Sequence, residues 1–245
     1  MEWIDDAIVL SARSHGETSA IASVLSCEYG RYAGLVRGGT GKRMRGILQP
    51  GNRTRARWWA RLPEHLGTLQ CELTAPHAAR AFDDRRGLSG LSAACTMADV
   101  VLPEREPQRA VFDALARFLD LLEEDRWPEE LVRWELVLLR EIGFGLDLGR
   151  CAATGRSDQL IYVSPKTGRA VSKDAGEPYR RSLLALPPFL SPGGGAASAR
   201  DVADGLRLTG YFLEKHALAP LARQSPAARQ RLYDMLASEA ESQGD

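Results

Sequence analysis

The chain contains 245 residues, of which 44% are hydrophobic and 26% are charged. These values are ordinary for a globular protein and argue against disorder, collagen-like repeats and coiled-coil composition. No run of about 18 apolar residues is present, so we expect no membrane-spanning segment. The acidic start at residues 1–6 argues against a secretory signal peptide, and four scattered cysteines without a Cys-x-x-Cys pair indicate reduced thiols in the cytoplasm.

The net charge of zero conceals an uneven distribution of charge along the chain. Residues 1–30 carry one basic and five acidic side chains, whereas residues 31–61 carry nine basic side chains and no acidic one. The rest of the chain carries 22 basic and 27 acidic side chains. A short basic segment of this kind points to a polyanionic partner more strongly than the overall neutrality argues against one.

The N-terminal 75 residues predict about five short β-strands separated by turns. Apolar or alternating stretches occur at 7–10, 18–27, 32–36, 53–62 and 66–74, and turn signals such as Gln49-Pro50-Gly51-Asn52 lie between them. The glycine-rich segment 38–42 shows no helix signal and is expected to be a loop. This number and spacing of strands predict a small Greek-key barrel.

From residue 78 onward the apolar period becomes that of helices. Helices are predicted around 88–102, 111–122, 131–142, 199–216 and 226–241, and Asp83-Asp84 is expected to cap the first of them. Trp127, Leu131, Trp134 and Leu138 are expected in the helix-packing core. Residues 150–176 are punctuated by glycines and are expected to be irregular. The predicted fold class is therefore multidomain α+β, with an N-terminal barrel followed by a helical region.

The sharpest chemical feature is a basic strand at residues 53–62. Because alternate side chains of a strand point to opposite faces, one face holds Arg53, Arg55, Arg57, Trp59 and Arg61. The opposite face, which holds Thr54, Ala56, Trp58, Ala60 and Leu62, suits a barrel interior. Guanidiniums at every second position repeat at about 6.6 Å, close to the phosphate spacing of an extended nucleic-acid strand. An indole among them offers a stacking surface for a base.

More basic side chains lie on or beside the glycine-rich segment, namely Arg37, Lys42, Arg43 and Arg45. Together with the basic face of the strand they make nine candidate DNA-binding residues. The segment lacks the Gly-x-x-x-x-Gly-Lys-Ser/Thr pattern and no helix is expected after it, which argues against a P-loop. No helix carries the polar cluster of a major-groove reader, so we expect little sequence preference. The alternative is a solvated edge strand whose charges deter aggregation.

Several segments form an ordered series, namely Ala7 to Leu10, Gly16 to Ala20, Tyr29 to Gly38, Leu48 to Gly51, and Glu135 to Leu148 followed by Cys151. Taken in this order, they resemble the bacterial RecO family. The resemblance implies an OB fold over residues 1–78, a helical domain over 79–149 and 177–245, and a zinc-ribbon-like insertion over 150–176. It also implies binding of single- and double-stranded DNA and annealing of complementary strands. With RecR, and in many bacteria RecF, such a protein helps to load RecA onto DNA coated by the single-stranded DNA-binding protein, SSB.

The insertion departs from the four-cysteine zinc site of many family members. Its two knuckle-like segments read CAATG at 151–155 and SPKTG at 164–168, so one of four thiolates remains. A hydroxyl is a poor zinc ligand, and we expect this degenerate region to fold without a metal or any other cofactor. The hydroxyls of Thr154, Ser164 and Thr167 are then expected to bond turn amides. A three-cysteine site that borrows Cys95 is the alternative.

No segment indicates an enzyme active site. Ser14 and His15 are adjacent on a predicted strand and point to opposite faces, and neither Gly-x-Ser-x-Gly nor Gly-x-Gly-x-x-Gly occurs in a strand–helix context. We therefore expect a non-enzymatic, nucleoid-associated recombination mediator. Arg133 and Arg140 are candidate contacts for the acidic tail of SSB. The alternatives are an OB-fold scaffold whose basic face binds an acidic protein and, from a third class, a hydrolase or nuclease.

Overall fold

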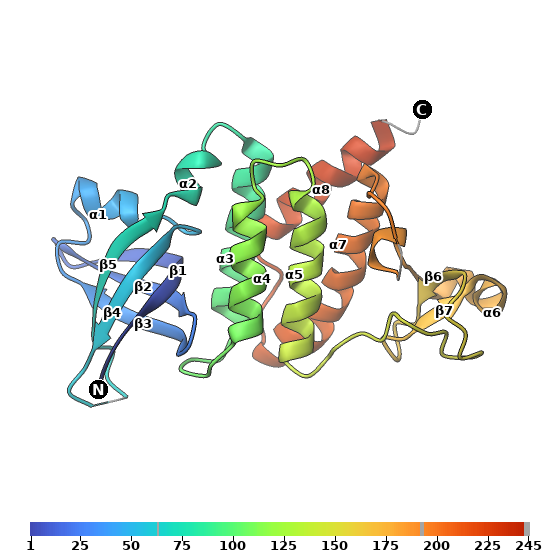
Figure 1. Cartoon of the computed structure of the whole chain (residues 1–245), viewed down its shortest axis with the longest axis horizontal. Coiled ribbons are helices and arrows are strands. Elements are labelled where there is room, and N and C mark those ends of the chain that lie inside the picture. Colours follow the sequence, from blue (N-terminus) through green and yellow to red (C-terminus); the bar gives the residue numbers. More distant parts are fainter. Residues whose placement is uncertain (63, 192–193, 243–245) are drawn as a thin grey trace. The chain divides into compact units, whose positions relative to one another are not determined.

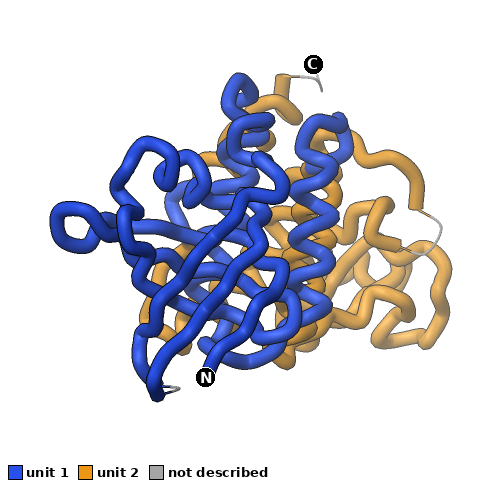
Figure 2. Tube along the Cα trace, turned by 60° about the vertical axis from the view of Figure 1, so that its left-hand side comes forward, with its two compact units in different colours: residues 1–127, 226–229 blue, residues 128–225, 230–245 orange. Residues whose placement is uncertain are grey.

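The computed structural model describes residues 1–62, 64–191 and 194–242 (Figure 1). The chain divides into two compact units (Figure 2). The first unit contains residues 1–127 and 226–229, and the second contains residues 128–225 and 230–245. Strands dominate the N-terminal part and helices dominate the C-terminal part, so the mixed α+β class is confirmed. Within the described ranges, no helix combines the length and the apolar character needed to cross a bilayer.

The N-terminal strands close into a barrel. They are β1 (Glu2–His15), β2 (Ser19–Ser26), β3 (Gly30–Val36), β4 (Arg53–Trp59) and β5 (Thr68–Ala75). The order around the barrel is β1-β2-β3-β5-β4, and all neighbouring pairs are antiparallel except β3 and β5. All five predicted strands are present. However, β1 begins well before the apolar run at 7–10, because its buried positions already alternate from Trp3 onward.

Aromatic rings fill part of the barrel interior. The ring of Trp58 stacks on that of Trp3 at a centroid distance of 6.3 Å and meets the edge of Tyr32 at 5.0 Å. Although Trp58 is fully buried, its indole N–H donates to the carbonyl oxygens of Ala33 at 3.0 Å and Leu66 at 3.1 Å. Because these acceptors satisfy the indole N–H, the ring can be buried without the free-energy cost of an unpaired donor. Trp58 therefore fixes which face of β4 points inward.

A short helix, α1 (Lys42–Ile47), connects β3 to β4 where we predict only a loop. The prediction is wrong here because six residues are too few for an apolar helical period to be visible. The side-chain amide of Asn52 donates to the carbonyl oxygens of Gly46 at 2.9 Å and Ile47 at 3.2 Å and so satisfies the end of α1. The basic residues Lys42, Arg43 and Arg45 therefore lie on a helix.

The first unit also contains α2 (His77–Arg80), α3 (Arg85–Val101) and α4 (Arg109–Asp120). Asp84 caps α3 as predicted, because its carboxylate accepts hydrogen bonds from the backbone N–H groups of Arg86 and Gly87, both at 2.9 Å. This cap satisfies two of the donors that a helix start leaves unpaired, and it fixes where α3 begins.

Helix α3 is fastened to the outer face of β1, β2 and β3 through Asp99. The carboxylate of Asp99 accepts hydrogen bonds from the hydroxyls of Ser11 at 2.8 Å and Ser23 at 2.6 Å, and it pairs with Arg31 at 3.5 Å. These three partners belong to β1, β2 and β3 respectively. Part of the outer face of these strands is therefore covered by α3, whereas the outward positions of β4 and β5 are mostly exposed or half-buried.

The second unit contains α7 (Ala199–Leu213) and most of α5 (Trp127–Glu141) and α8 (Ala227–Ser242). The first residue of α5 and residues 227–229 of α8 belong to the first unit. A π-helical turn, η3 (Glu214–Leu218), and a 3-10 turn, η4 (Ala219–Leu221), follow α7. The predicted core positions Trp127, Leu131, Trp134 and Leu138 are all at most 4% exposed, so this prediction is confirmed.

Residues 150–176, which we predict to be irregular, contain ordered strands. β6 (Leu160–Val163) pairs with β7 (Ala170–Ser172) and with β8 (Leu184–Ala185) in a sheet of order β7-β6-β8. The prediction is wrong because strands of two to four residues are too short to show an alternating pattern. The short helix α6 (Lys173–Gly176) ends this region, and the 3-10 turns η1 (Glu177–Ser182) and η2 (Pro188–Leu190), like β8, lie after it.

Candidate nucleic-acid interface

Strand β4 divides its side chains between the two faces as predicted. Thr54, Ala56 and Trp58 are fully buried, whereas the side chains of Arg55 and Arg57 are 51% and 50% exposed. The register with β1 and β5 holds β4 in the middle of this side of the barrel, since both neighbours pair along its whole length. The outward guanidiniums are therefore carried by a strand that is fixed on both sides.

The basic face is shorter than we predict. β4 ends at Trp59, so Arg61 lies beyond the strand and the pairing no longer sets the direction of its side chain. At the other end, the guanidinium of Arg53 lies 5.7 Å from the ring centroid of Phe112 in α4, and the side chain is 32% exposed. The Arg53 side chain is thus partly covered by a helix of its own unit.

A groove with a volume of about 1770 Å³ opens over the outer side of β4 and β5. Residues of α1 and α2 also contribute to its lining. It gathers five of the nine predicted DNA-binding residues, namely Arg37, Arg43, Arg55, Arg57 and Trp59. The described lining residues do not include the other four, Lys42, Arg45, Arg53 and Arg61. The groove therefore joins guanidiniums from β4 with basic residues from the segment around α1.

The groove also contains exposed apolar side chains that sequence reasoning missed. Phe82, which follows α2, is 74% exposed, and Ile4, Leu73 and Leu88 are 53%, 38% and 39% exposed. Single apolar residues are common on protein surfaces, so the sequence carries no signal that marks these four. Their gathering beside several guanidiniums suits a ligand that offers both flat apolar faces and negative charge.

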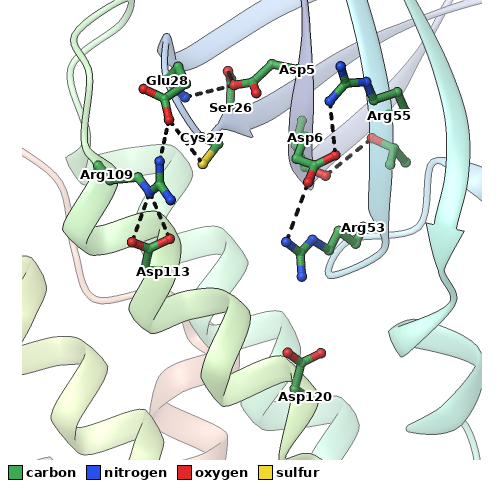
Figure 3. A network of polar contacts seen from close by, with 12 residues as sticks. Asp5, Asp6, Ser26, Cys27, Glu28, Arg53, Arg55, Arg109, Asp113 and Asp120 are labelled. Atoms are coloured by element: carbon green, nitrogen blue, oxygen red, sulfur yellow. Dashed lines mark hydrogen bonds and ion pairs between the residues drawn. The ribbon is translucent and has the colours of Figure 1, made fainter.

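The basic strand is opposed by carboxylates, contrary to our expectation. Asp6 of β1 lies 3.4 Å from a terminal nitrogen of Arg55 and 3.7 Å from one of Arg53 (Figure 3). Glu2 of β1 pairs with Nε of Arg57 at 2.6 Å. The acid-free window at residues 31–61 concealed this, because antiparallel pairing brings the acidic start of the chain alongside β4.

Trp59 is half-buried at the end of β4, and one side of its ring is occupied. The guanidinium of Arg57 lies 5.3 Å from the centroid of this ring. Arg57 is therefore held between an indole and the carboxylate of Glu2, a combination of cation–π and ionic contacts. A base that stacks on Trp59 would use the ring face away from Arg57 or would displace the guanidinium.

The two candidate contacts for the SSB tail, Arg133 and Arg140, both lie on α5 in the second unit. Arg133 pairs with Glu130 at 2.7 Å and with Glu129 at 3.4 Å. Arg140 is 61% exposed and pairs with its neighbour Glu141 at 3.0 Å. Each guanidinium therefore already has a carboxylate partner within the chain.

The two knuckle-like segments of the second unit form turns of matching geometry. In the first, the N–H of Gly155 donates to the carbonyl of Cys151 at 2.8 Å, and in the second the N–H of Gly168 donates to the carbonyl of Ser164 at 2.8 Å. Both glycines have positive φ, of +72° and +68°, which favours glycine at these positions. The turns therefore keep the knuckle shape through main-chain hydrogen bonds.

Threonine hydroxyls support these turns as we predict. Thr154 accepts a hydrogen bond from the N–H of Arg156, and Thr167 accepts one from the N–H of Arg169, both at 3.4 Å. Ser164 takes part through its main chain, since its N–H donates to the carbonyl oxygen of Arg169 at 2.9 Å.

The donor set of this region does not fit zinc. Cys151 is fully buried, and its sulfur accepts a hydrogen bond from the N–H of Ser172 at 3.3 Å. In the parts of the chain that the structure describes, no three His, Cys, Asp or Glu side chains are grouped as a metal site would require. Burial raises the pKa of the Cys151 thiol, but hydrogen bonds from Ser172 and Thr154 outweigh it and bring the pKa to about 6.

Comparison with known proteins assigns both parts of the chain. The family model described as "Recombination protein O N terminal" matches residues 1–77, and the one described as "Recombination protein O C terminal" matches residues 83–224. The chain is 57% identical over 236 residues to the "DNA repair protein RecO" of Rhodospirillum centenum, covering 96% of this chain and 94% of that protein. It is 52% identical over 243 residues to the protein of the same name from Rhodospirillum rubrum, covering 96% of each chain.

Proposed function

Because this chain belongs to the RecO family of DNA repair proteins, we propose that it is a recombination mediator without enzymatic activity, and that its groove binds single-stranded DNA. The observation that carries the proposal is the gathering of Arg37, Arg43, Arg55, Arg57 and Trp59 along one groove. Guanidiniums contact phosphates of any sequence, while Trp59 and Phe82 offer rings to the bases. The third candidate class, a nuclease, would cleave labelled DNA with magnesium or manganese, and we expect no cleavage.

The proposal includes two finer points of architecture. We assign the barrel as an OB fold, which the strand order β1-β2-β3-β5-β4 and a helix between β3 and β4 support. We assign the sheet β7-β6-β8 with its two knuckle turns as a zinc-ribbon-like insertion that folds without the metal. OB folds often bind along strands 2 and 3. Here Asp99 and α3 occupy that side, which favours β4 and β5 instead.

Annealing follows from charge neutralisation in this proposal. Two complementary strands repel each other through their phosphates, and a protein that neutralises part of this charge lowers the barrier to pairing. The groove residues can do this without nucleotide hydrolysis. The same electrostatic term supports binding of double-stranded DNA, since it reads the backbone and not the bases.

The proposed partners follow from the family. With RecR, and with RecF where it is present, the protein would help RecA to load onto DNA coated by SSB. The acidic tail of SSB would contact α5 at Arg133 and Arg140. The surface that binds RecR would belong to the helical part of the chain.

An annealing assay on SSB-coated complementary strands tests the proposal. The variant R53A/R55A/R57A should lose most single-strand binding and annealing while its thermal unfolding stays near that of the wild type. The matched control R156A/R169A/R180A removes three arginines of the second unit that are also paired with carboxylates. This control should keep most of the DNA binding in the groove.

The salt dependence of binding provides a second reading of the same mechanism. If about five phosphates are contacted, the logarithm of the single-strand affinity should fall with the logarithm of salt concentration with a slope of about −3.5. A slope near zero would contradict the proposal. Unchanged DNA binding in the triple variant would instead favour the scaffold alternative, in which the basic and apolar groove binds an acidic protein.

A further inference from the structure

The outward face of β1 supplies carboxylates to the arginines of β4. Asp6 lies directly opposite Arg55 in the β1–β4 register and is one pleat away from Arg53. It lies 3.4 Å from the guanidinium of Arg55 and 3.7 Å from that of Arg53 (Figure 3). One carboxylate thus serves two guanidiniums of the predicted phosphate-binding row.

The second carboxylate repeats this arrangement along the strand. Glu2 is diagonal to Arg57 across the β1–β4 pair and accepts a hydrogen bond from its Nε at 2.6 Å. Both partners are about half exposed, at 50% and 48%. The row of guanidiniums on β4 is therefore already paired, in the free protein, with anionic oxygens from the neighbouring strand.

These carboxylates occupy the kind of interaction that a phosphate would make. A carboxylate and a phosphate both present oxygens to a guanidinium, often in bidentate fashion. We propose that Glu2 and Asp6 are built-in competitors for DNA phosphates, which lower the affinity of the groove and speed the release of the bound strand. This inference rests on the proposed function, because it presumes that Arg55 and Arg57 in the groove, with Arg53 beside them on β4, contact DNA.

The strength of these ion pairs determines how far the carboxylates weaken DNA binding. Ion pairs at half-exposed positions contribute about 0.2–1 kcal/mol, so each carboxylate should weaken DNA binding by up to about fivefold. Competitors of this strength do not block the groove, since a strand that makes several phosphate contacts displaces them together. They do make each contact easier to break.

Release matters for a protein that anneals strands. A strand bound too tightly stays in the groove and the duplex cannot leave, whereas a weakened contact allows turnover. For related complexes, changes in affinity are expressed mostly in the dissociation rate. We therefore expect the competitors to act chiefly on dissociation.

A double-mutant cycle tests the inference directly. E2Q and D6N should each raise the affinity for a labelled oligothymidylate about two- to fivefold, with slower dissociation in stopped-flow measurements. The gain from E2Q should vanish in the R57A background, and the gain from D6N should vanish in the R53A/R55A background. The control E17Q/D125N removes the same two kinds of charge at exposed positions and should give less than the gain of E2Q/D6N.

The outcomes separate the two proposals. A gain that persists after the arginines are removed, or that the control reproduces in full, would reflect overall charge and would overturn the competitor role. Loss of binding in the arginine variants without any gain from E2Q or D6N would overturn this inference and leave the proposed function intact. DNA binding that is unchanged in both the arginine variants and the carboxylate variants would overturn the proposed function itself. Circular dichroism melting of every variant establishes that the barrel is folded.

Discussion

Gly67, between β4 and β5, lies so close to the indole of Trp58 that a Cβ atom at this position would overlap the ring. Gly67 also has a φ of +72°, in the left-handed region that favours glycine. Two separate physical requirements, steric and conformational, therefore fall on one residue. They matter for the site because the same Trp58 sets which way the arginines of β4 point.

A pair of glycine substitutions separates these two requirements. Gly16 has a φ of +64°, but no atom lies within 4 Å of where its Cβ would stand. G16A should therefore lower the free energy of unfolding only through the left-handed backbone conformation, by about 1–2 kcal/mol. G67A should lower it by roughly a further 1–3 kcal/mol, because the added methyl group overpacks the site. Urea unfolding followed by circular dichroism measures both. Equal effects of the two substitutions would contradict the close packing of Gly67 on Trp58.

Asp99 should be among the more costly carboxylates to remove from the first unit. D99A removes the acceptor for Ser11, Ser23 and Arg31 and should destabilise the unit by about 2–3 kcal/mol. D113A is the matched control, since Asp113 is an exposed helical carboxylate that pairs with Arg109. Its loss should cost at most about 1 kcal/mol in the same urea unfolding experiment. A D99A protein as stable as D113A would mean that α3 is held to the barrel by other contacts.

Phe82 should affect binding without affecting stability. Its side chain is 74% exposed, so F82A should leave the unfolding midpoint nearly unchanged. If bases stack on the ring, the free energy of single-strand binding should become less favourable by about 1–3 kcal/mol in fluorescence anisotropy titrations. Y179A removes an aromatic side chain that is 66% exposed in the second unit and serves as the control. An F82A protein that binds as tightly as Y179A would remove Phe82 from the interface.

The four cysteines should titrate in widely separated ranges. The pKa of Cys151 is held at about 6, since hydrogen bonds to its sulfur outweigh its burial, whereas burial raises the pKa of Cys27 and Cys71 to about 11 and that of Cys95 to about 12. Thiolate absorbance near 240 nm should show a step of one thiolate near pH 6 that is lost in C151S and kept in C95S.

The same titration has a consequence for stability. The folded state lowers the pKa of Cys151 from its ordinary value of 9.0, so it favours the thiolate more than the unfolded chain does. The stabilisation from this group is therefore fully present above about pH 9 and is lost as the pH falls through about 6. Urea midpoints of the wild type should rise relative to C151S across this interval. Parallel pH profiles of the two proteins would contradict the lowered pKa.

Local sequence patterns predicted much of the fold, because the alternation of a strand and the apolar spacing of a helix can each be recognised within one element. The two faces of β4, the cap at Asp84 and the buried stripe around Trp134 could all be predicted in this way. α1 and β6 were missed because they are too short to display a period.

The site was less predictable because it depends on long-range pairing. The carboxylates of Glu2 and Asp6 meet β4 only through the register of β1, and no local charge count contains that register. Leu73 belongs to β5 and Phe82 to the turn after α2, and both line the groove. A basic window in a sequence thus indicates the sign of a surface, while the neighbouring strands decide how much of that charge is available.

The placement of the tryptophans gives the groove its own optical signal. Trp3, Trp58, Trp127 and Trp134 are at most 4% exposed, whereas Trp59 alone among the five lies in the groove lining. Quenching of the intrinsic emission by an added oligonucleotide would therefore come mainly from one indole. The variant W59F would keep a tryptophan fluorescence that reports unfolding but changes little when the oligonucleotide binds.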